Sequence, residues 1–267
     1  MESRLKRAQG ARERAAAAPL FAGWEETPLY SALEGEMGSV WTLDGAADAA
    51  LAECADFLFL AADGPESAAP LLAAWRRERA GEYRILTARD PALLSLAARV
   101  FGGDASPTRR YAFEKGGERF DRQRLANFAA SVPAGVVLRG FDRDLYRLAL
   151  QAKWSRDFCS QFCSEDDFLA RGIGVAALCG DELAGGASSY TRYGAGIEIQ
   201  VETRADMRRR GIALACCARL ILDCMDRGLY PSWDAANEAS VRLAVRLGYR
   251  LRGPYEALEL YRPCGAV

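Results

Sequence analysis

The pattern of apolar and polar residues predicts strands and helices in alternation along the chain. In the first half, short apolar runs typical of strands are separated by stretches in which apolar residues recur every three or four positions, as in amphipathic helices. The expected strands are 38–44, 56–62, 83–87 and 109–114, and the expected helices are 67–80, 91–101 and 118–130, after a helix, a loop and a helix over 1–36. This order is typical of an α/β domain.

The second half of the chain has a related order. The pattern predicts a strand at 136–139, helices at 142–150 and 155–171, and a hairpin of strands at 174–179 and 182–190. Residues 131–135 read Ser-Val-Pro-Ala-Gly, a composition typical of a junction. We therefore expect two domains, 1–130 and 131–267.

The most informative segment is a strand, a basic turn and a helix in direct succession. Residues 197–203 alternate apolar and polar side chains, Arg208-Arg209-Arg210-Gly211 follows, and a helical pattern runs from Ile212 to Arg227. Such a turn directs main-chain N–H groups outward at the positive end of the helix dipole, where a bound phosphate is favoured. The segment predicts a phosphate site, with a solvated basic turn as the alternative.

A second helix starts with a good capping residue shortly afterwards. Residues 230–236 read as a short strand, Asn237 is a good N-cap, and Gly248 is a good residue to end the helix. Val241, Ala244, Val245 and Gly248 fall on one helical face.

The two blocks together resemble the GNAT N-acetyltransferase superfamily. Arg208, Gly211 and Ala213 meet its pattern Q/R-x-x-G-x-G/A, and Asn237 with Gly248-Tyr249 meets its second block. The resemblance covers about residues 134–262. The whole chain is also similar to a bacterial GNAT subfamily with an additional N-terminal domain, through residues 21–27, 154–159 and 186–190.

The resemblance implies an α/β (α+β) protein with a C-terminal GNAT fold, in which helices flank a central mixed, mostly antiparallel sheet. A smaller α/β domain precedes it, with a degenerate GNAT-like copy as one interpretation and a scaffold or a lid on the substrate side as its expected role. The acidic turn Asp63-Gly64-Pro65-Glu66 of that domain has the wrong charge for a pyrophosphate.

The resemblance also implies acetyl-CoA as co-substrate and no metal. The pantetheine arm would pair with the strand before the basic turn, a main-chain N–H near Val201 or Glu202 would polarise the acetyl carbonyl, and the turn would hold the pyrophosphate. The implied cofactor-binding residues are Val201, Thr203, Arg208, Arg209, Arg210, Gly211, Ile212, Ala213 and Asn237.

Catalytic candidates are limited because the chain has no histidine. Glu198, Gln200 and Glu202 fall on one face of the strand, since side chains alternate along it. We expect Glu198 to act as general base or to orient a water, with Glu202 as second choice and a solvated strand face as the alternative. The tyrosine that many GNAT enzymes use as general acid is replaced by Ala244, and Tyr249 is a substitute candidate or a core residue.

Substrate recognition is expected from the helices before the hairpin and from the strand beside the catalytic one. Trp154, Ser188 and Tyr190 are candidates there, and the acidic run Glu165-Asp166-Asp167 would suit a cationic amine unless it is a solvated helix face.

Composition limits the remaining possibilities. The chain has 267 residues and a net charge of −1, which does not predict a broad nucleic-acid surface. No apolar run reaches the length of a membrane span, and residues 1–14 lack a signal-peptide core. Eight cysteines without a CxxC pair are expected to be mostly buried thiols. We expect a cytoplasmic protein, with a homodimer as one option.

The predicted function is transfer of an acetyl group to the amine of a small-molecule acceptor by direct attack on the thioester. The alternative is a non-catalytic sensor or regulatory module that binds CoA or acyl-CoA. A thiol-release assay with acetyl-CoA and a panel of amines distinguishes the two.

Overall fold

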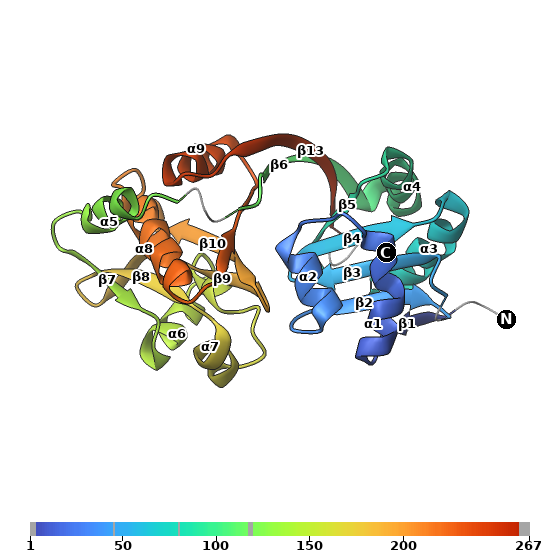
Figure 1. The fold of residues 1–267 in the computed structure, drawn as a ribbon, viewed down its shortest axis with the longest axis horizontal. Coiled ribbons are helices and arrows are strands. Elements are labelled where there is room, and N and C mark those ends of the chain that lie inside the picture. Colours follow the sequence, from blue (N-terminus) through green and yellow to red (C-terminus); the bar gives the residue numbers. More distant parts are fainter. Residues whose placement is uncertain (1–3, 45, 80, 117–119, 262–267) are drawn as a thin grey trace. The chain divides into compact units, whose positions relative to one another are not determined.

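The computed structural model describes residues 4–44, 46–79, 81–116 and 120–261, which form two compact units (Figure 1). Unit 1 runs to Arg110 and includes the chain from Pro254 onward, and unit 2 is Tyr111–Gly253. The sequence placed the boundary at 130/131 instead. The difference arises because helix α5 (Arg122–Ala130) packs on a helix of unit 2, and because the last strand returns to unit 1.

In unit 1 the strand order is β1-β2-β3-β4-β5-β13. Neighbouring strands are antiparallel except β4 and β5, which are parallel and are joined through helix α3. The strands are β1 (Leu5–Arg7), β2 (Ser39–Leu43), β3 (Ala49–Cys54), β4 (Phe57–Ala62), β5 (Arg84–Ala88) and β13 (Leu251–Leu260). The helices are α1 (Ala11–Ala17), η1 (Ala18–Phe21), α2 (Thr27–Glu34), α3 (Pro65–Arg79), α4 (Pro91–Phe101) and η2 (Gly102–Asp104).

In unit 2 a second sheet has the order β11-β10-β9-β8-β7, again antiparallel except for the pair β10 and β11, which is joined through helix α8. The strands are β7 (Val136–Gly140), β8 (Gly174–Cys179), β9 (Glu182–Tyr193), β10 (Gly196–Thr203) and β11 (Tyr230–Ser232), followed by the short β12 (Asp234–Ala235). The other elements are α6 (Arg143–Leu150), η4 (Arg156–Phe158), α7 (Glu165–Arg171), η5 (Ala205–Met207), α8 (Ile212–Asp226) and α9 (Glu238–Leu247).

The two units repeat one order of elements. Each has a strand, two helices, three antiparallel strands, a helix, a strand parallel to the one before that helix, and a further helix. Unit 1 is therefore a copy of the topology of unit 2, as the sequence interpretation proposed.

The boundaries between the units fall within two strands, β6 (Ala105–Phe113) and β13. In unit 1, Leu258 and Leu260 of β13 pair with β5 and lie in the core. In unit 2, β12 pairs with Tyr111 and Ala112, which belong to β6 (Ala105–Phe113). Unit 1 is therefore discontinuous in sequence, whereas unit 2 is the continuous stretch Tyr111–Gly253.

Two parts of the sequence interpretation need correction. The helix expected over 155–171 is instead η4, a loop, and α7, which starts at Glu165 because the hydroxyl of its N-cap Ser164 accepts a hydrogen bond from the Asp167 N–H. Strand β3 was not predicted, since its Ala-Ala-Leu-Ala-Glu-Cys sequence is buried on both faces and has no alternation.

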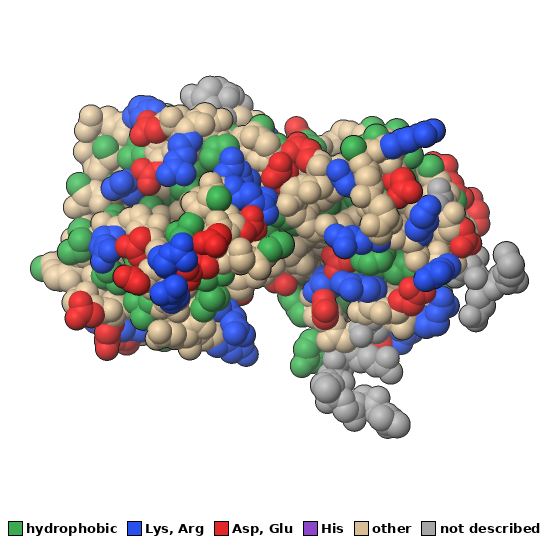
Figure 2. Space-filling view, turned by 90° about the horizontal axis from the view of Figure 1, so that it is seen from below, with side chains coloured by type: hydrophobic (Ala, Val, Ile, Leu, Met, Phe, Trp, Pro, Cys, Tyr) green, Lys and Arg blue, Asp and Glu red, His purple; other side chains and the backbone are tan. Residues whose placement is uncertain are grey.

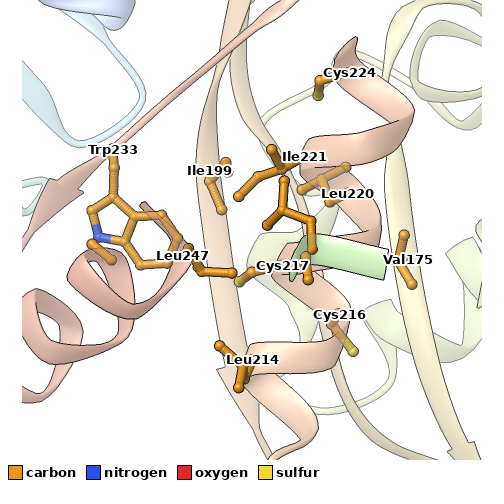
Figure 3. Close-up of a cluster of buried hydrophobic side chains, with 14 of the residues drawn as sticks. Val175, Ile199, Leu214, Cys216, Cys217, Leu220, Ile221, Cys224, Trp233 and Leu247 are labelled. Atoms are coloured by element: carbon orange, nitrogen blue, oxygen red, sulfur yellow. The ribbon is translucent and has the colours of Figure 1, made fainter. Parts of the chain in front are cut away.

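The core of unit 2 is built on α8, which packs on the sheet and on α5 and α9 (Figure 3). Figure 3 shows Cys216, Cys217 and Cys224 among Leu220 and Ile221 on this helix. All three thiols are buried, and burial raises the pKa of Cys216 to about 12. Of the seven cysteines that the structure describes, five are buried, as expected for most of them, and Cys163 and Cys179 are exposed; Cys264 lies outside the described residues.

Charged side chains of both signs are interspersed on the face of the molecule drawn in Figure 2. None of the described helices has both the length and the apolar character that crossing a bilayer requires.

Candidate active site

Strands β10 and β11 separate soon after they meet. They pair only over Gly196–Glu198 and Tyr230–Ser232, whereas β10 stays paired with β9 as far as Thr203. Beyond Ser232 the chain enters β12, which pairs with β6. Within the described residues, the edge of β10 from Ile199 to Thr203 therefore faces no strand.

The direction of the main-chain groups on this edge follows from the register. The Arg204 N–H donates to the Ala184 carbonyl of β9, so by alternation the N–H groups of Thr203 and Val201 point to the other edge. The Thr203 N–H donates to the Glu202 carboxylate at 3.0 Å. Val201 thus presents a main-chain N–H at the open edge, while that of Glu202 points toward β9.

The basic turn leaves a run of main-chain donors without acceptors. In the described part of the chain, no oxygen accepts a hydrogen bond from the N–H groups of residues 208–214. The first hydrogen bond of α8 is from Ala215 to Gly211. Gly211 and Arg209 have φ values of 86° and 61°, so the turn passes twice through the left-handed region, once at a non-glycine residue. Successive N–H groups in such a turn form an anion-binding concavity.

Other helices of unit 2 are capped by side chains at their N-termini, unlike α8. Asp121, Asp142, Ser164 and Asn237 each accept a hydrogen bond from the first turn of α5, α6, α7 and α9, respectively. Gly211 has no side chain that could do this. The start of α8 is thus the place where an added anion would satisfy main-chain donors.

The side chains of the turn differ in their positions. Arg208 turns back along β10, where it donates to Glu202 Oε1 at 3.1 Å and to the Thr203 carbonyl at 3.2 Å. Arg209 and Arg210 are exposed. Ile212 is buried in the core, so it contributes its main chain alone, and Ala213 is half-buried.

The polar face of β10 is as the alternation predicted. Ile197 and Ile199 lie in the core against α8, which places Glu198, Gln200 and Glu202 on the opposite face. Glu198 is only 4% exposed. The register between β9 and β10 shifts by one residue between Glu198 and Ile199, and Tyr190 is the extra residue of this β-bulge in β9.

Segment η4 lies over this face. The Ser188 hydroxyl donates to the Phe158 carbonyl at 2.6 Å, and a Cβ atom on Gly186 would lie 3.1 Å from the Phe158 ring, a tight contact. Trp154 is half-buried and meets Phe158 edge-on, with ring centroids 6.1 Å apart. Ser188 and Tyr190 are buried, so of the three substrate candidates only Trp154 presents exposed surface.

Tyr249, the substitute candidate for the general acid, has a structural role in this arrangement. The Tyr249 hydroxyl donates to the Pro231 carbonyl at 2.6 Å, and its ring packs on Phe120 and Trp233. Burial raises the pKa of Tyr249 well above its usual value. Tyr249 is therefore a core residue and not a proton donor at the site. Ala244 is fully buried.

The acidic run of α7 does not provide free negative charge. The Glu165 carboxylate accepts hydrogen bonds from Arg143 and Arg147. The Asp166 carboxylate accepts one from Arg143, and the Asp167 carboxylate accepts one from Arg171. These ion pairs contradict the interpretation of the run as a site for a cationic amine.

Sequence reasoning missed a polar group on the face of Glu198. Ser232 lies next to Glu198 in the parallel register, and the Lys115 ammonium donates to the Ser232 hydroxyl at 2.7 Å. Lys115 is one of three lysines in the chain, which is the only local signal that it carries. Among the described residues, no group of three or more Cys, Asp or Glu side chains could hold a metal ion.

The family model of the GNAT acetyltransferases, described as "GNAT acetyltransferase", matches residues 18–258. The chain belongs to this family. The match confirms the resemblance that the basic turn and the Asn237 helix indicated, and it includes most of unit 1.

Individual relatives agree with the family. A curated relative from Bacillus subtilis (strain 168), the uncharacterized N-acetyltransferase YdfB, is 26% identical over 155 residues, or 57% of this chain. The aligned part of this chain spans 56% of the length of that relative.

Solved structures support the fold of both units. A GCN5-related N-acetyltransferase-like protein from Streptococcus suis 89/1591 is 38% identical, with a TM-score of 0.84 over 93% of this chain and 98% of that one. A tandem GNAT protein from the clavulanic acid biosynthesis pathway is 15% identical, with a TM-score of 0.59 over 97% of each chain, and shows the fold alone. The predicted fold class is confirmed.

Proposed function

We propose that unit 2 is an acetyl-CoA-dependent N-acetyltransferase that acts on the amine of a small-molecule acceptor. The observation that carries the proposal is the run of main-chain N–H groups over residues 208–214, next to a strand with one open edge. A diphosphate at the turn and an extended pantetheine arm along β10 would satisfy both sets of groups at once.

In this proposal the main chain of β10 directs the thioester. The Val201 N–H donates to the acetyl oxygen, which stabilises the negative charge that develops there. Asn237 keeps its capping role, since its side chain accepts a hydrogen bond from the Ser240 N–H at 3.0 Å. In this proposal its amide group also contacts the cofactor, as the family pattern implies.

The acceptor amine approaches from the polar face of β10. Its nitrogen attacks the carbonyl carbon, a C–N bond forms, the C–S bond breaks, and the CoA thiolate leaves. The proton lost from nitrogen goes to Glu198, directly or through one water. The thiolate takes its proton from solvent, because α9 offers Ala244 at the position of the family's tyrosine.

The first test of the proposal is the melting temperature of the protein with and without acetyl-CoA. A ligand at about 100 times its dissociation constant stabilises the folded state by about 2.7 kcal/mol. No shift at millimolar acetyl-CoA would reject the cofactor assignment.

The second test is thiol release with a panel of amines. Release of the CoA thiol with any acceptor supports enzymatic acetyl transfer. A melting shift without release from a broad panel would favour the alternative of a CoA-binding sensor.

A further inference from the structure

The segment that follows β6 brings a fixed positive charge to the face of Glu198. Lys115 donates to the Ser232 hydroxyl at 2.7 Å, and Ser232 is fully buried. The same segment is held by its main chain, since the Glu114 N–H donates to the Arg250 carbonyl at 2.9 Å. Lys115 is thus anchored to unit 2 at its side chain and at the neighbouring peptide.

Ser232 and Glu198 project from the same side of the sheet. They are paired residues of the parallel strands β10 and β11. Ile197, which precedes Glu198, and Trp233, which follows Ser232, lie in the core of unit 2. Neighbouring strands are about 4.8 Å apart. The Lys115 ammonium is therefore bound to the residue that neighbours Glu198 across the two strands, at the point where β10 and β11 separate.

Charged side chains of β10, α6 and α7 form ion pairs. Glu202 pairs with Arg208, and Glu165, Asp166 and Asp167 pair with arginines of α6 and α7. Among the described residues, no carboxylate lies within ion-pair distance of Lys115, which is half-buried. A half-buried ammonium is stabilised by an anion, and a compound that enters this site can supply one.

We propose that the acceptor is an amino-acid-type compound, an amine with a carboxylate on the same or the neighbouring carbon, whose carboxylate binds Lys115 while its amine faces Glu198. A lysine ammonium has three N–H donors. Ser232 takes one, and the remaining two can contact the carboxylate oxygens. The hydroxyl of Ser232 holds the ammonium in place, on the strand that pairs with β10 at Glu198.

This proposal rests on the proposed function, and matched substrates test it separately. Thiol release is measured with pairs that differ only in the carboxyl group, such as L-alanine with L-alaninamide and β-alanine with β-alaninamide. We expect kcat/KM at least tenfold higher for the acid of a pair. Equal rates, or a preference for the amides, would overturn the proposal even if acetyl transfer is confirmed.

Variants of the lysine assign the preference to this position. Lys115→Met should remove the preference for acids by raising KM for the acid, and it should keep the acetyl-CoA melting shift. Lys115→Arg should keep part of the preference for acids, and Ser232→Ala should weaken this preference. Lys6→Met, in unit 1, is the control and should behave as wild type. A preference that survives Lys115→Met contradicts the assignment.

Binding provides a readout when turnover is too slow to measure. Titration of the acids and amides into the protein with CoA, followed by calorimetry, should show binding of an acid that Lys115→Met abolishes. Absence of acid binding would overturn the proposal. Absence of the acetyl-CoA melting shift would instead overturn the proposed function.

Discussion

Units 1 and 2 repeat one topology, yet they differ in the two features on which acetyl-CoA binding would depend. In unit 1 the strand before the crossover helix, β4, pairs with β5 over four of its six residues, Phe57–Leu60. In unit 2 the equivalent strand, β10, pairs with β11 over three of its eight residues. Unit 1 therefore offers almost no open edge for an extended ligand.

The turn into the crossover helix differs as well. In unit 1 only Asp63 and Gly64 separate β4 from α3, which starts at a proline without an N–H group. In unit 2 residues 204–211 separate β10 from α8, and they supply both main-chain donors and arginines. The shorter acidic turn of unit 1 has neither the donors nor the charge for a diphosphate.

The strand face that bears Glu198 in unit 2 is part of the core in unit 1. Phe57 and Phe59 stack there, with ring centroids 5.8 Å apart, and Trp24 packs edge-on against Phe59. A face filled by aromatic rings has no room for an acceptor. The same face of the equivalent strands is thus packed in the core of unit 1 and lines the candidate site of unit 2.

The largest expected effect is loss of cofactor binding from the turn of unit 2. Gly211→Glu should abolish the melting shift with acetyl-CoA, because a carboxylate would point to the diphosphate position. Gly180→Glu is the matched control, since Gly180 also has a positive φ and open space around it but lies in the β8–β9 hairpin. An unchanged shift in the Gly211 variant would remove the turn from the site.

The next largest effect is on turnover. Glu198→Gln should lower kcat by about 10²–10⁴-fold, the range for loss of a general base, and leave the acetyl-CoA melting shift unchanged. Glu202→Gln should have a smaller effect, since Glu202 pairs with Arg208 at the surface. Full activity of the Glu198 variant would show that the buried carboxylate is structural.

An effect of a few kcal/mol is expected from the strand that unit 1 takes from the end of the chain. Leu258→Ala should lower the free energy of unfolding by about 2–4 kcal/mol, since Leu258 is 4% exposed in the core of unit 1. Urea unfolding measures this, and the acetyl-CoA shift of unit 2 should persist. Leu251→Ala is the control, because Leu251 is 43% exposed, and it should change stability by about 0.5 kcal/mol or less. Equal losses of unfolding free energy in both variants would contradict the role of β13 in the core of unit 1.

The smallest effect is a pH dependence confined to unit 1. Burial alone raises the pKa of Glu53, but hydrogen bonds and charges from Arg84, with Arg79 and Trp41, outweigh it and lower the pKa below the ordinary 4.5. The carboxylate thus stabilises unit 1 at pH values above 4.5, and this stabilisation is lost as the pH falls through the lowered pKa. The free energy of unfolding of unit 1, measured between pH 3 and 6, should decline as the pH is lowered. Glu53→Gln should flatten it, and an unchanged slope would contradict this account.

The sequence predicted the parts of the site that lie within one segment. The alternation of residues 197–203, the glycine turn and the Asn237 cap are local patterns, and the structure has the strand, the turn and the capped helix at these positions. The roles of these residues toward acetyl-CoA stay predictions. Tyr249 was a candidate because it lies close in sequence to the helix. Closeness in sequence does not reveal that its hydroxyl is buried against Pro231.

What the sequence alone determined is the family, the order of the elements and the polar face of β10, because each depends on residues a few positions apart. The tertiary structure alone decided the pairing of β13 with β5 in unit 1, the separation of β10 from β11, and the contact of Lys115 with Ser232 across 117 positions. The physical reason is that strand pairing joins segments distant in sequence, and its partners depend on the packing of the whole sheet and not on any local pattern.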